Sequence, residues 1–382
     1  MKKGTLGYCI IAGVLIIGCA VFFIGRNIKN NNEEQNKEEI KNTLVNISDA
    51  YDVDELLASE YDNIELPSSL NVDEVDTVSN VILKVPDYEE QNKKIDIKFF
   101  QDNLKKLGYE YDEKCVVDDK GKTYPYGKYY MQEEPYIYIS TGCTGFFSVD
   151  SIGTHDYEVV EEFYANAPYE DKEYELVGGP MKVSGAINTF EQLETEYIAE
   201  MNYDIPVAKV FRVRLVKDEN QQLRYELDAQ MSYKGIDTFY INDTYKRSGI
   251  KYESSLGASG LISGENVANG ISVTLSGFPT ECVSEEQIDK VISIKDATDI
   301  INQKLAEYKK NKLVNVKMEY LSFFEERTYE ERHMTAEWTE ICSGNKFRLK
   351  PYWVFVFDST TNSEIIGLVD CVTGEVGLVY NQ

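Results

Sequence analysis

The side chains that could perform acid–base chemistry are few in this sequence. Only two of its 382 residues are histidines. His155 precedes Asp156 and lies close to Ser151, which are the residue types of a hydrolytic triad, but a triad functions only where its three groups converge in space. A solvated loop histidine is the simpler interpretation. His333 lies in an acidic stretch, where a pH-sensing role is the functional alternative.

Adjacent carboxylates are frequent and carry little information. A glycosidase needs two carboxyl groups held across a sugar, but 66 residues are Asp or Glu, so neighbouring pairs arise by chance. Three such pairs are Glu133–Glu134, Glu161–Glu162 and Glu325–Glu326. The sequence contains no phosphate-binding loop, zinc-protease motif or nucleophile elbow. We therefore predict no catalytic residue, no cofactor and no metal site.

The cysteines leave two interpretations open. Cys9 and Cys19 lie in an apolar N-terminal stretch, and five more follow: Cys115, Cys143, Cys282, Cys342 and Cys371. No two of these form a Cys-x-x-Cys pair, which argues against a structural zinc site. In an oxidising compartment one or two disulfides would form among the five. Alternatively they are small buried hydrophobic residues, which we favour for Cys371 because its neighbours are apolar.

The formal net charge of −27 narrows the choice of partners. Nucleic acid and anionic lipid headgroups would repel such a surface, so we expect neither to bind, whereas basic proteins and cations are favoured. Hydrophobic residues make up 42% of the chain, enough for a folded core. The 28 tyrosines suit strands that bury a ring and expose its hydroxyl.

The N-terminus predicts where the protein resides. Lys2 and Lys3 precede residues 6–24, which carry no charge and as a helix would be about 28 Å long, enough to span a bilayer. The lysines favour a cytoplasmic N-terminus, with the acidic body outside. In a second interpretation, "LIIGC" is a loose lipoprotein signal and Cys19 is lipidated, although the apolar run continues past it. A third interpretation, a cleaved signal peptide, is disfavoured because no clean cleavage site precedes a polar segment.

The chain divides into five predicted segments. Residues 1–30 form the membrane anchor, and the polar, acidic residues 31–80 are interpreted as a disordered stalk. Residues 81–185 are predicted as an N-terminal α+β domain, and residues 186–285 as a helix followed by antiparallel strands. Residues 286–382 form a C-terminal α+β domain. The predicted fold class is α+β, with antiparallel sheets that are each covered by a helix.

Helices and one hairpin follow from apolar spacing and capping residues. Thr189 and Gln192 have the spacing of a capping box, and Ser293 precedes Asp296 by the same interval. Residues 207–236 alternate strongly and are interrupted at residues 218–222, which predicts a β-hairpin. The predicted helices comprise residues 97–107, 156–167, 187–201 and 293–308.

The stretch from Lys350 to Val376 predicts two strands and a tight turn. In the first strand, alternation places Trp353 and Phe355 on one face and Tyr352 and Val354 on the other. We assign Trp353 and Phe355 to the helix-covered core, because large rings anchor a small sheet. Tyr352 and Val354 are the candidate face for a partner.

The C-terminal part of the chain resembles a known family. The stretches "SIKDATDIINQKL", "VNVKMEYLSF", "LKPYWVFVF" and "IIGLVDCVTGEV" are similar to PepSY-like domains, and most to extracellular regulatory proteins of the YycI and YycH type. "YKGIDTF" is similar to an upstream strand of that family. Pro351, Trp353, Asp370 and Gly374 match its Pro-x-Trp segment and its Asp-x-x-x-Gly turn. The resemblance covers roughly residue 223 to the C-terminus and implies a non-enzymatic modulator of a membrane kinase or cell-surface protease.

These observations predict a membrane-anchored extracytoplasmic protein that acts by protein–protein interaction, as a regulator or adaptor of a cell-surface sensor kinase or protease. One alternative is a hydrolase of cell wall or peptide, and another is a surface lipoprotein that binds a small ligand or cation. An enzyme would require a cleft where buried polar groups converge near His155. A regulator would present a shallow apolar face or an exposed strand edge.

Overall fold

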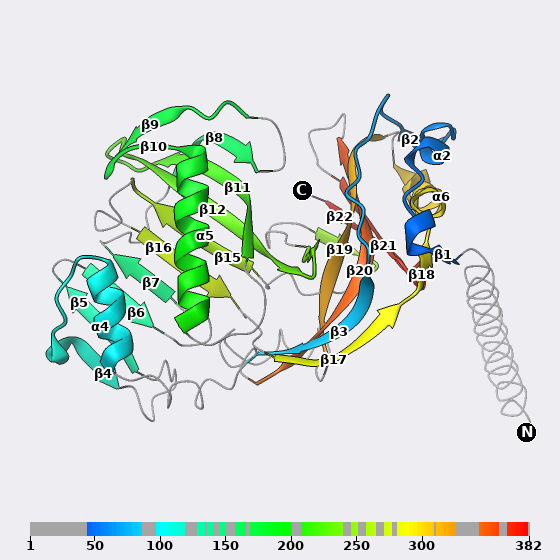
Figure 1. Cartoon of the computed structure of the whole chain (residues 1–382). Coiled ribbons are helices and arrows are strands. Elements are labelled where there is room, and N and C mark those ends of the chain that lie inside the picture. The colour runs from blue at the N-terminus through cyan, green and yellow to red at the C-terminus, as the bar shows by residue number, and fades with distance from the viewer. Residues whose placement is uncertain are drawn as a thin grey trace, which may run out of the picture.

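The structure is a computed structural model that describes residues 44–85, 97–118, 128–133, 136–140, 146–149, 157–165, 169–200, 208–239, 246–250, 257–264, 271–276, 281–308, 311–325, 344–358 and 365–380. Within these ranges the protein is a mixed α+β fold of mostly antiparallel strands, which confirms the predicted class at that level (Figure 1). The predicted anchor lies outside them. No helix in the described ranges is long and apolar enough to cross a membrane.

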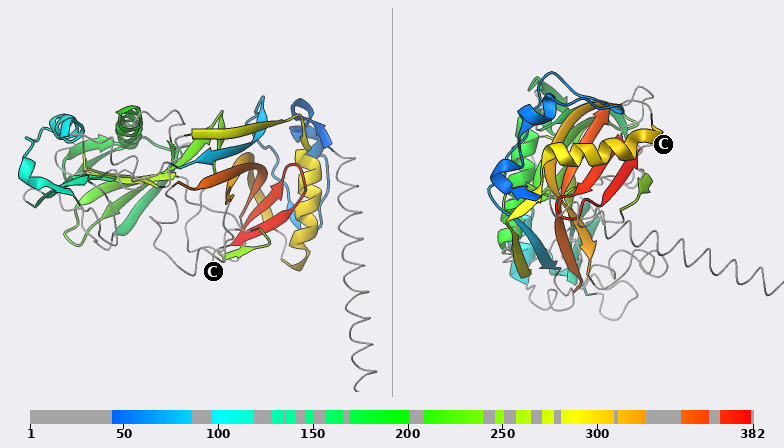
Figure 2. Two further views of the ribbon diagram at one scale, coloured as in Figure 1. Left: turned by 90° about the horizontal axis from the view of Figure 1, so that it is seen from below. Right: turned by 90° about the vertical axis from the view of Figure 1, so that its right-hand side faces the viewer.

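Ten of the described strands form one sheet, built from the middle of the chain. Its order is β4-β5-β6-β7-β16-β15-β12-β11-β8, and β13 pairs with the end of β12. Figure 2 shows that α4 (Ile97–Lys106) and α5 (Val183–Glu200) lie on the same face of this sheet. The strands are β4 (Val116–Asp118), β5 (Lys128–Glu133), β6 (Tyr136–Ser140), β7 (Phe146–Val149), β8 (Glu158–Tyr164), β11 (Ala208–Lys217), β12 (Leu223–Tyr233), β13 (Ile236–Asp237), β15 (Gly257–Ile262) and β16 (Ile271–Ser276).

Eight further described strands form a second sheet, which α6 (Ile294–Lys304) covers on one face (Figure 2). The order β14-β22-β21-β20-β19-β2 is extended by β3, which pairs with the first part of β20, and by β17, which pairs with β3. The strands are β2 (Ile64–Glu65), β3 (Val78–Lys84), β14 (Lys246–Ser248), β17 (Glu281–Ile288), β19 (Asn311–Phe324), β20 (Lys346–Asp358), β21 (Ile365–Asp370) and β22 (Val376–Tyr380).

The expected disordered stalk is wrong from Leu44 onward, because this segment packs against the C-terminal unit. β1 (Leu44–Asn46) pairs with β18 (Lys290–Ile292), and α2 (Val53–Leu57) follows β1. Leu56 is completely buried. Asn63 donates its backbone amide to the side chain of Asn302, 239 residues later in the chain, at 3.0 Å. The acidic composition hides apolar residues whose partners are too distant in sequence to be inferred.

A helix followed by four antiparallel strands in sheet order occurs three times in the described residues. α4 precedes β4 to β7, α5 precedes β11, β12, β15 and β16, and α6 precedes β19 to β22. The first two units join through their last strands, because β7 pairs with β16. The predicted division at residues 185 and 186 therefore crosses a single sheet, and β17 belongs to the C-terminal sheet rather than to the segment 186–285.

The C-terminal unit has its main core between α6 and the sheet. Ser293 caps the helix by accepting a hydrogen bond from the amide of Asp296 at 3.1 Å, as predicted. Trp353 and Phe355 are fully buried, and the indole Nε1 of Trp353 donates to the carbonyl oxygen of Ile292 at 2.9 Å. A Cβ on Gly367 would lie 2.7 Å from a carbon of the Ile301 side chain, so this glycine permits the close approach of α6 to β21.

The start of α5 differs from the prediction. The helix begins at Val183 rather than near Thr189, and a hairpin of β9 (Glu173–Leu176) and β10 (Gly179–Lys182) leads directly into it. Asp171 supplies the cap, because it accepts hydrogen bonds from the backbone amide of Ser184 at 3.0 Å and from its hydroxyl at 2.6 Å. This cap comes from outside the helix, so the local capping-box pattern did not reveal it.

A hairpin connects the two sheets. Lys234 and Gly235 have positive φ angles of 49° and 87°, as a two-residue hairpin turn requires, and return the chain from β12 to β13. The next residue, Thr238, bridges to Tyr320 in β19 of the other sheet. At the turn, Lys234 Nζ contacts Glu285 in β17 at 2.6 Å. The end of β12 therefore belongs to one sheet and contacts the other.

Candidate functional site

The candidate site is β8, which with β4 is one of the two edge strands of the ten-stranded sheet as described. Residues 156–167 are predicted as a short helix, but the structure forms an antiparallel strand against β11 over Glu158–Tyr164. The helix prediction is wrong because pairing with a neighbouring strand outweighs local spacing in valine- and tyrosine-rich segments. No other strand in the described part of the chain pairs with β8. Within the described residues, its outer edge is therefore an unpaired strand edge.

The backbone of β8 has a defined inner and outer side. The amide of Ala165 donates to the carbonyl oxygen of Phe211 at 3.0 Å. In an antiparallel pair, alternate residues direct their N–H and C=O groups toward the same neighbour. Glu161 and Phe163 therefore hydrogen-bond toward β11, whereas Glu162 directs its backbone groups away from it. Outward-directed N–H and C=O groups of this kind can form hydrogen bonds with a further strand.

The side chains of β8 are partly apolar and strongly acidic. Val159, Val160 and Tyr164 are 49%, 50% and 45% exposed, which is high for large apolar residues. A register shift leaves Val160 as an extra residue between the paired positions of Val159 and Glu161. The strand carries no basic residue. Its acidic residues are Glu158, Glu161 and Glu162.

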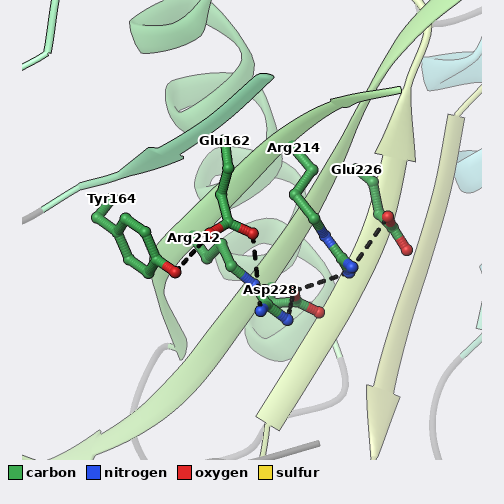
Figure 3. A network of polar contacts seen from close by, with 6 residues as sticks. All are labelled: Glu162, Tyr164, Arg212, Arg214, Glu226 and Asp228. Atoms are coloured by element: carbon green, nitrogen blue, oxygen red, sulfur yellow. Dashed lines mark hydrogen bonds and ion pairs between the residues drawn. The ribbon is translucent and has the colours of Figure 1, made fainter. Parts of the chain in front are cut away.

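A network of charged side chains lies beside β8, on strands β11 and β12 (Figure 3). Arg212 donates to one carboxylate oxygen of Asp228 through Nε at 2.9 Å and Nη2 at 2.7 Å. Arg214 Nη2 reaches the same oxygen at 3.2 Å and Glu226 at 3.2 Å. Only 8% of the Asp228 side chain is exposed, so this carboxylate is the buried centre of the network.

The network reaches the edge strand through Glu162. Its carboxylate lies 4.0 Å from Arg212 Nη1 and accepts a hydrogen bond from the hydroxyl of Tyr164 at 2.5 Å (Figure 3). Arg212 is engaged more closely by Asp228, at 2.7 Å. The ion pair of Arg212 with Glu162 is thus longer than its ion pair with Asp228, and the Glu162 carboxylate retains capacity for another cation.

The polar network has a recognisable signature in the sequence. Arg212 and Arg214 alternate with apolar residues on one strand of the predicted hairpin, as Glu226 and Asp228 do on the other. A turn centred on residues 218–222 places Arg212 opposite Asp228 and Arg214 opposite Glu226, as observed. Opposite charges at facing positions of a hairpin stabilise it and identify its polar face.

Two carboxylates of α5 accept hydrogen bonds from backbone amides at the beginning of β11. Glu194 accepts a hydrogen bond from the amide of Ala208 at 3.2 Å, and Glu191 accepts one from the amide of Val210 at 3.1 Å. These amides lie before Arg212, where the pairing with β8 ends. Glu194 is fully buried, and burial, with the charge of Glu191 adding to it, raises its pKa to about 8. Its described role is to close the beginning of this strand.

The C-terminal sheet buries the carboxylate of Glu319. Glu319 is 2% exposed and forms an ion pair with Lys317, two positions earlier on β19. Burial raises the pKa of Glu319, and the charge of Lys317 opposes this shift. The pair lies on the face of the sheet that carries Tyr352, because Glu319 and Tyr352 are opposite each other in the ladder. It balances charge within the fold.

The candidate partner face of Tyr352 and Val354 requires correction. Both lie on the face opposite Trp353 and Phe355, but they are 0% and 1% exposed. They pack in a second apolar cluster, and so are covered by the chain itself. The members of this cluster are Phe239, Ile250, Leu321, Tyr352, Val354, Ile366, Leu368 and Val379, with Phe323 against it.

Several other sequence-predicted residues lie outside the described residues, among them His155, His333 and the candidate lipidation site Cys19. So do Cys143 and Cys342. The remaining cysteines after the apolar stretch are free thiols: Cys115, Cys282 and Cys371. Cys371 is completely buried, and burial raises the pKa of its thiol, whereas Cys282 is exposed.

No family model and no curated protein matches this chain. Among solved structures, it is similar to an uncharacterized protein from Eubacterium rectale whose crystal structure was determined at 1.45 Å resolution. The two share 12% sequence identity, and the TM-score is 0.46. The alignment covers 86% of this chain and 99% of the other.

Proposed function

We propose that this protein is held at the outer face of a membrane and acts by binding another protein, as a regulator or adaptor of a cell-surface sensor kinase or protease. The observation that carries the proposal is the outer edge of β8, with which no described strand pairs and beside which Val159, Val160 and Tyr164 are about half exposed. Exposed apolar groups at a strand edge are costly unless a partner uses them.

Two further observations support the proposal. Residues 6–24 carry no charge and have the length of a bilayer-spanning helix. The C-terminal unit packs a helix on an antiparallel meander and closes its last strands with a turn at Asp370, whose carboxylate accepts from the amides of Val372 and Thr373 at 2.8 Å. Both features agree with the resemblance to PepSY-like regulators of the YycI and YycH type.

The binding role is tested by site-specific crosslinking in intact cells. The full-length chain would carry a photoreactive phenylalanine derivative in place of Val160 or, as a control, in place of Val314. Val314 is 54% exposed but lies in the other sheet. We expect a discrete adduct with another membrane or surface protein at position 160 only. Equal adducts at both positions, or none at 160, would contradict a specific interface.

The predicted location is tested through Cys282, the exposed thiol of β17. A maleimide that cannot cross membranes should label the full-length chain in intact cells. The matched Cys282→Ser variant should lose this label, which separates Cys282 from the other cysteines. Labelling that appears only after the cells are lysed would place the body in the cytoplasm and overturn this part of the proposal.

A further inference from the structure

We infer that the outer edge of β8 binds an extended segment of its partner as an added strand, and that this segment alternates basic and apolar side chains. The inference rests on the proposed binding function and specifies the side chains of the segment that is bound. The first argument is the backbone. Because Glu162 directs its N–H and C=O groups away from β11, an incoming strand can continue the ladder without displacing any part of the sheet.

The second argument is charge. β8 contains three glutamates and no lysine or arginine. Glu158 already pairs with Lys217 at 3.0 Å. The basic side chains near Glu162 are engaged by another carboxylate, since Arg212 and Arg214 share that of Asp228 at 2.7 and 3.2 Å. Glu162 is left with an ion pair of 4.0 Å and a side chain that is 35% exposed. A lysine or arginine in the added strand would complete its pairing.

The third argument is the apolar contribution. Val159 and Val160 are adjacent and half exposed, one of them at a paired position and the other at the irregularity of the ladder. Apolar residues of an added strand would cover them and exclude water from the new hydrogen bonds. A segment with basic residues alone would leave this surface uncovered, so the partner needs both kinds of side chain.

A second copy of the chain does not fit the same edge. Antiparallel pairing of two β8 strands centred on Glu161 would place the two copies of Glu161 opposite each other, and like charges at facing positions are destabilising. Each copy also carries a formal net charge of −27. The occupant is therefore a basic segment of a different protein.

The test uses the full-length chain in detergent and a fluorescently labelled short peptide that alternates lysine with valine. The key comparison is Glu162→Pro against Glu162→Ala. Both remove the carboxylate, but only proline also removes the outward N–H, at a position where the inner ladder loses no bond. We expect the peptide to bind the Glu162→Ala variant about tenfold more tightly than Glu162→Pro. Equal affinities would overturn the inference.

A measurement on the unchanged protein covers the case in which Glu162→Pro fails to fold. One peptide is N-methylated at its odd-numbered backbone amides and the other at its even-numbered ones, so that each peptide has the opposite edge blocked. A strand that docks by one edge should lose affinity with one methylated peptide and keep it with the other. The inference is overturned if both bind like the parent peptide, or if a peptide with glutamate in place of lysine binds equally well.

The remaining outcomes separate this inference from the function on which it rests. A dimer of the full-length chain that Glu162→Pro dissociates would make a second copy the occupant and overturn the inference. A specific crosslink at Val160 without peptide binding would do the same while leaving the binding function intact. If neither the crosslink nor peptide binding is observed, both the inference and the proposed binding function are contradicted.

Discussion

The two sheets differ most on the faces that their helices leave uncovered. In the C-terminal sheet, that face is closed and largely apolar, with Tyr352 and Val354 in one cluster with Phe239 and Ile250, although it also buries the Lys317–Glu319 pair. In the ten-stranded sheet, the corresponding face of β11 and β12 carries the Arg212–Asp228 network. A sheet can thus complete its second face with its own chain or leave that face polar.

The difference is encoded in strand composition. β20 contains an uninterrupted apolar run from Tyr352 to Phe357, which is typical of a strand buried on both faces. β11 and β12 alternate apolar and charged residues, which is typical of a strand with one polar face. Assigning Tyr352 and Val354 to a partner required one face of β20 to be open, and the apolar run already argued against that.

The largest expected effect comes from tyrosines on these two faces. Tyr352→Ala removes a fully buried ring that packs 6.1 Å from Phe323, and should lower the free energy of unfolding by about 3–5 kcal/mol. Tyr164→Ala, on the polar face and 45% exposed, should lower it by less than about 1 kcal/mol. Denaturant unfolding measures both. Similar losses would show that the two faces are not as different as their side chains suggest.

The next effect concerns the centre of the charged network. Asp228→Ala leaves Arg212 and Arg214 close together with one shared partner removed, and should cost about 2 kcal/mol. Glu226→Ala removes a carboxylate whose side chain is 33% exposed and should cost less. Added salt should recover part of the loss for Asp228→Ala, because it screens the two arginines. A salt-independent loss would point to packing rather than charge.

Much of the fold was predictable because it depends on local pattern. The hairpin of β11 and β12, the capped start of α6 and the position of Trp353 all follow from residues close together in the sequence. The folded segment beginning at Leu44 was not predictable, because Asn63 and its neighbours pack on α6, far along the chain. The composition of this segment indicates its acidic surface but does not identify the residues that it buries.

The candidate site was only partly predictable. In residues 156–167 the valines and the Phe163–Tyr164 pair are spaced acceptably for a helix, and only pairing with β11 decides for a strand. The general expectation of an exposed strand edge did not specify β8. The charged network could have been found, because the turn at residues 218–222 fixes which arginine faces which carboxylate.

A pH dependence should distinguish the buried carboxylates of Glu194 and Glu319. The pKa of Glu194 is raised to about 8 in the folded protein, so the folded state binds this proton more tightly than the unfolded chain does. The resulting stability is complete below the ordinary glutamate pKa of about 4.5 and is lost as the pH rises through about 8. Glu194→Gln, which stays neutral, should unfold at a higher temperature than wild type near pH 9, with little difference near pH 5.

Glu319 provides the contrast for this experiment. Its carboxylate has Lys317 as a partner, whereas one oxygen of Glu194 has no hydrogen-bond partner among the described residues. Glu319→Gln should destabilise the protein at both pH values, because it leaves the lysine without its counter-ion. If Glu194→Gln is destabilising near pH 9 as well, its carboxylate is ionised in the folded state and the assigned protonation is wrong.

The smallest expected effect concerns the turn that connects the two sheets. Lys234→Ala removes the contact with Glu285, but the lysine side chain is 55% exposed, so the loss of stability should be below about 1 kcal/mol. Hydrogen exchange is the sensitive measurement, because Thr238 donates its amide to Met231 at 2.6 Å just beyond the turn. We expect faster exchange there in Lys234→Ala and no change in Lys295→Ala, which removes a similar ion pair within α6. Unchanged exchange in both would mean that the backbone bridge between Thr238 and Tyr320, rather than the ion pair, holds the two sheets together.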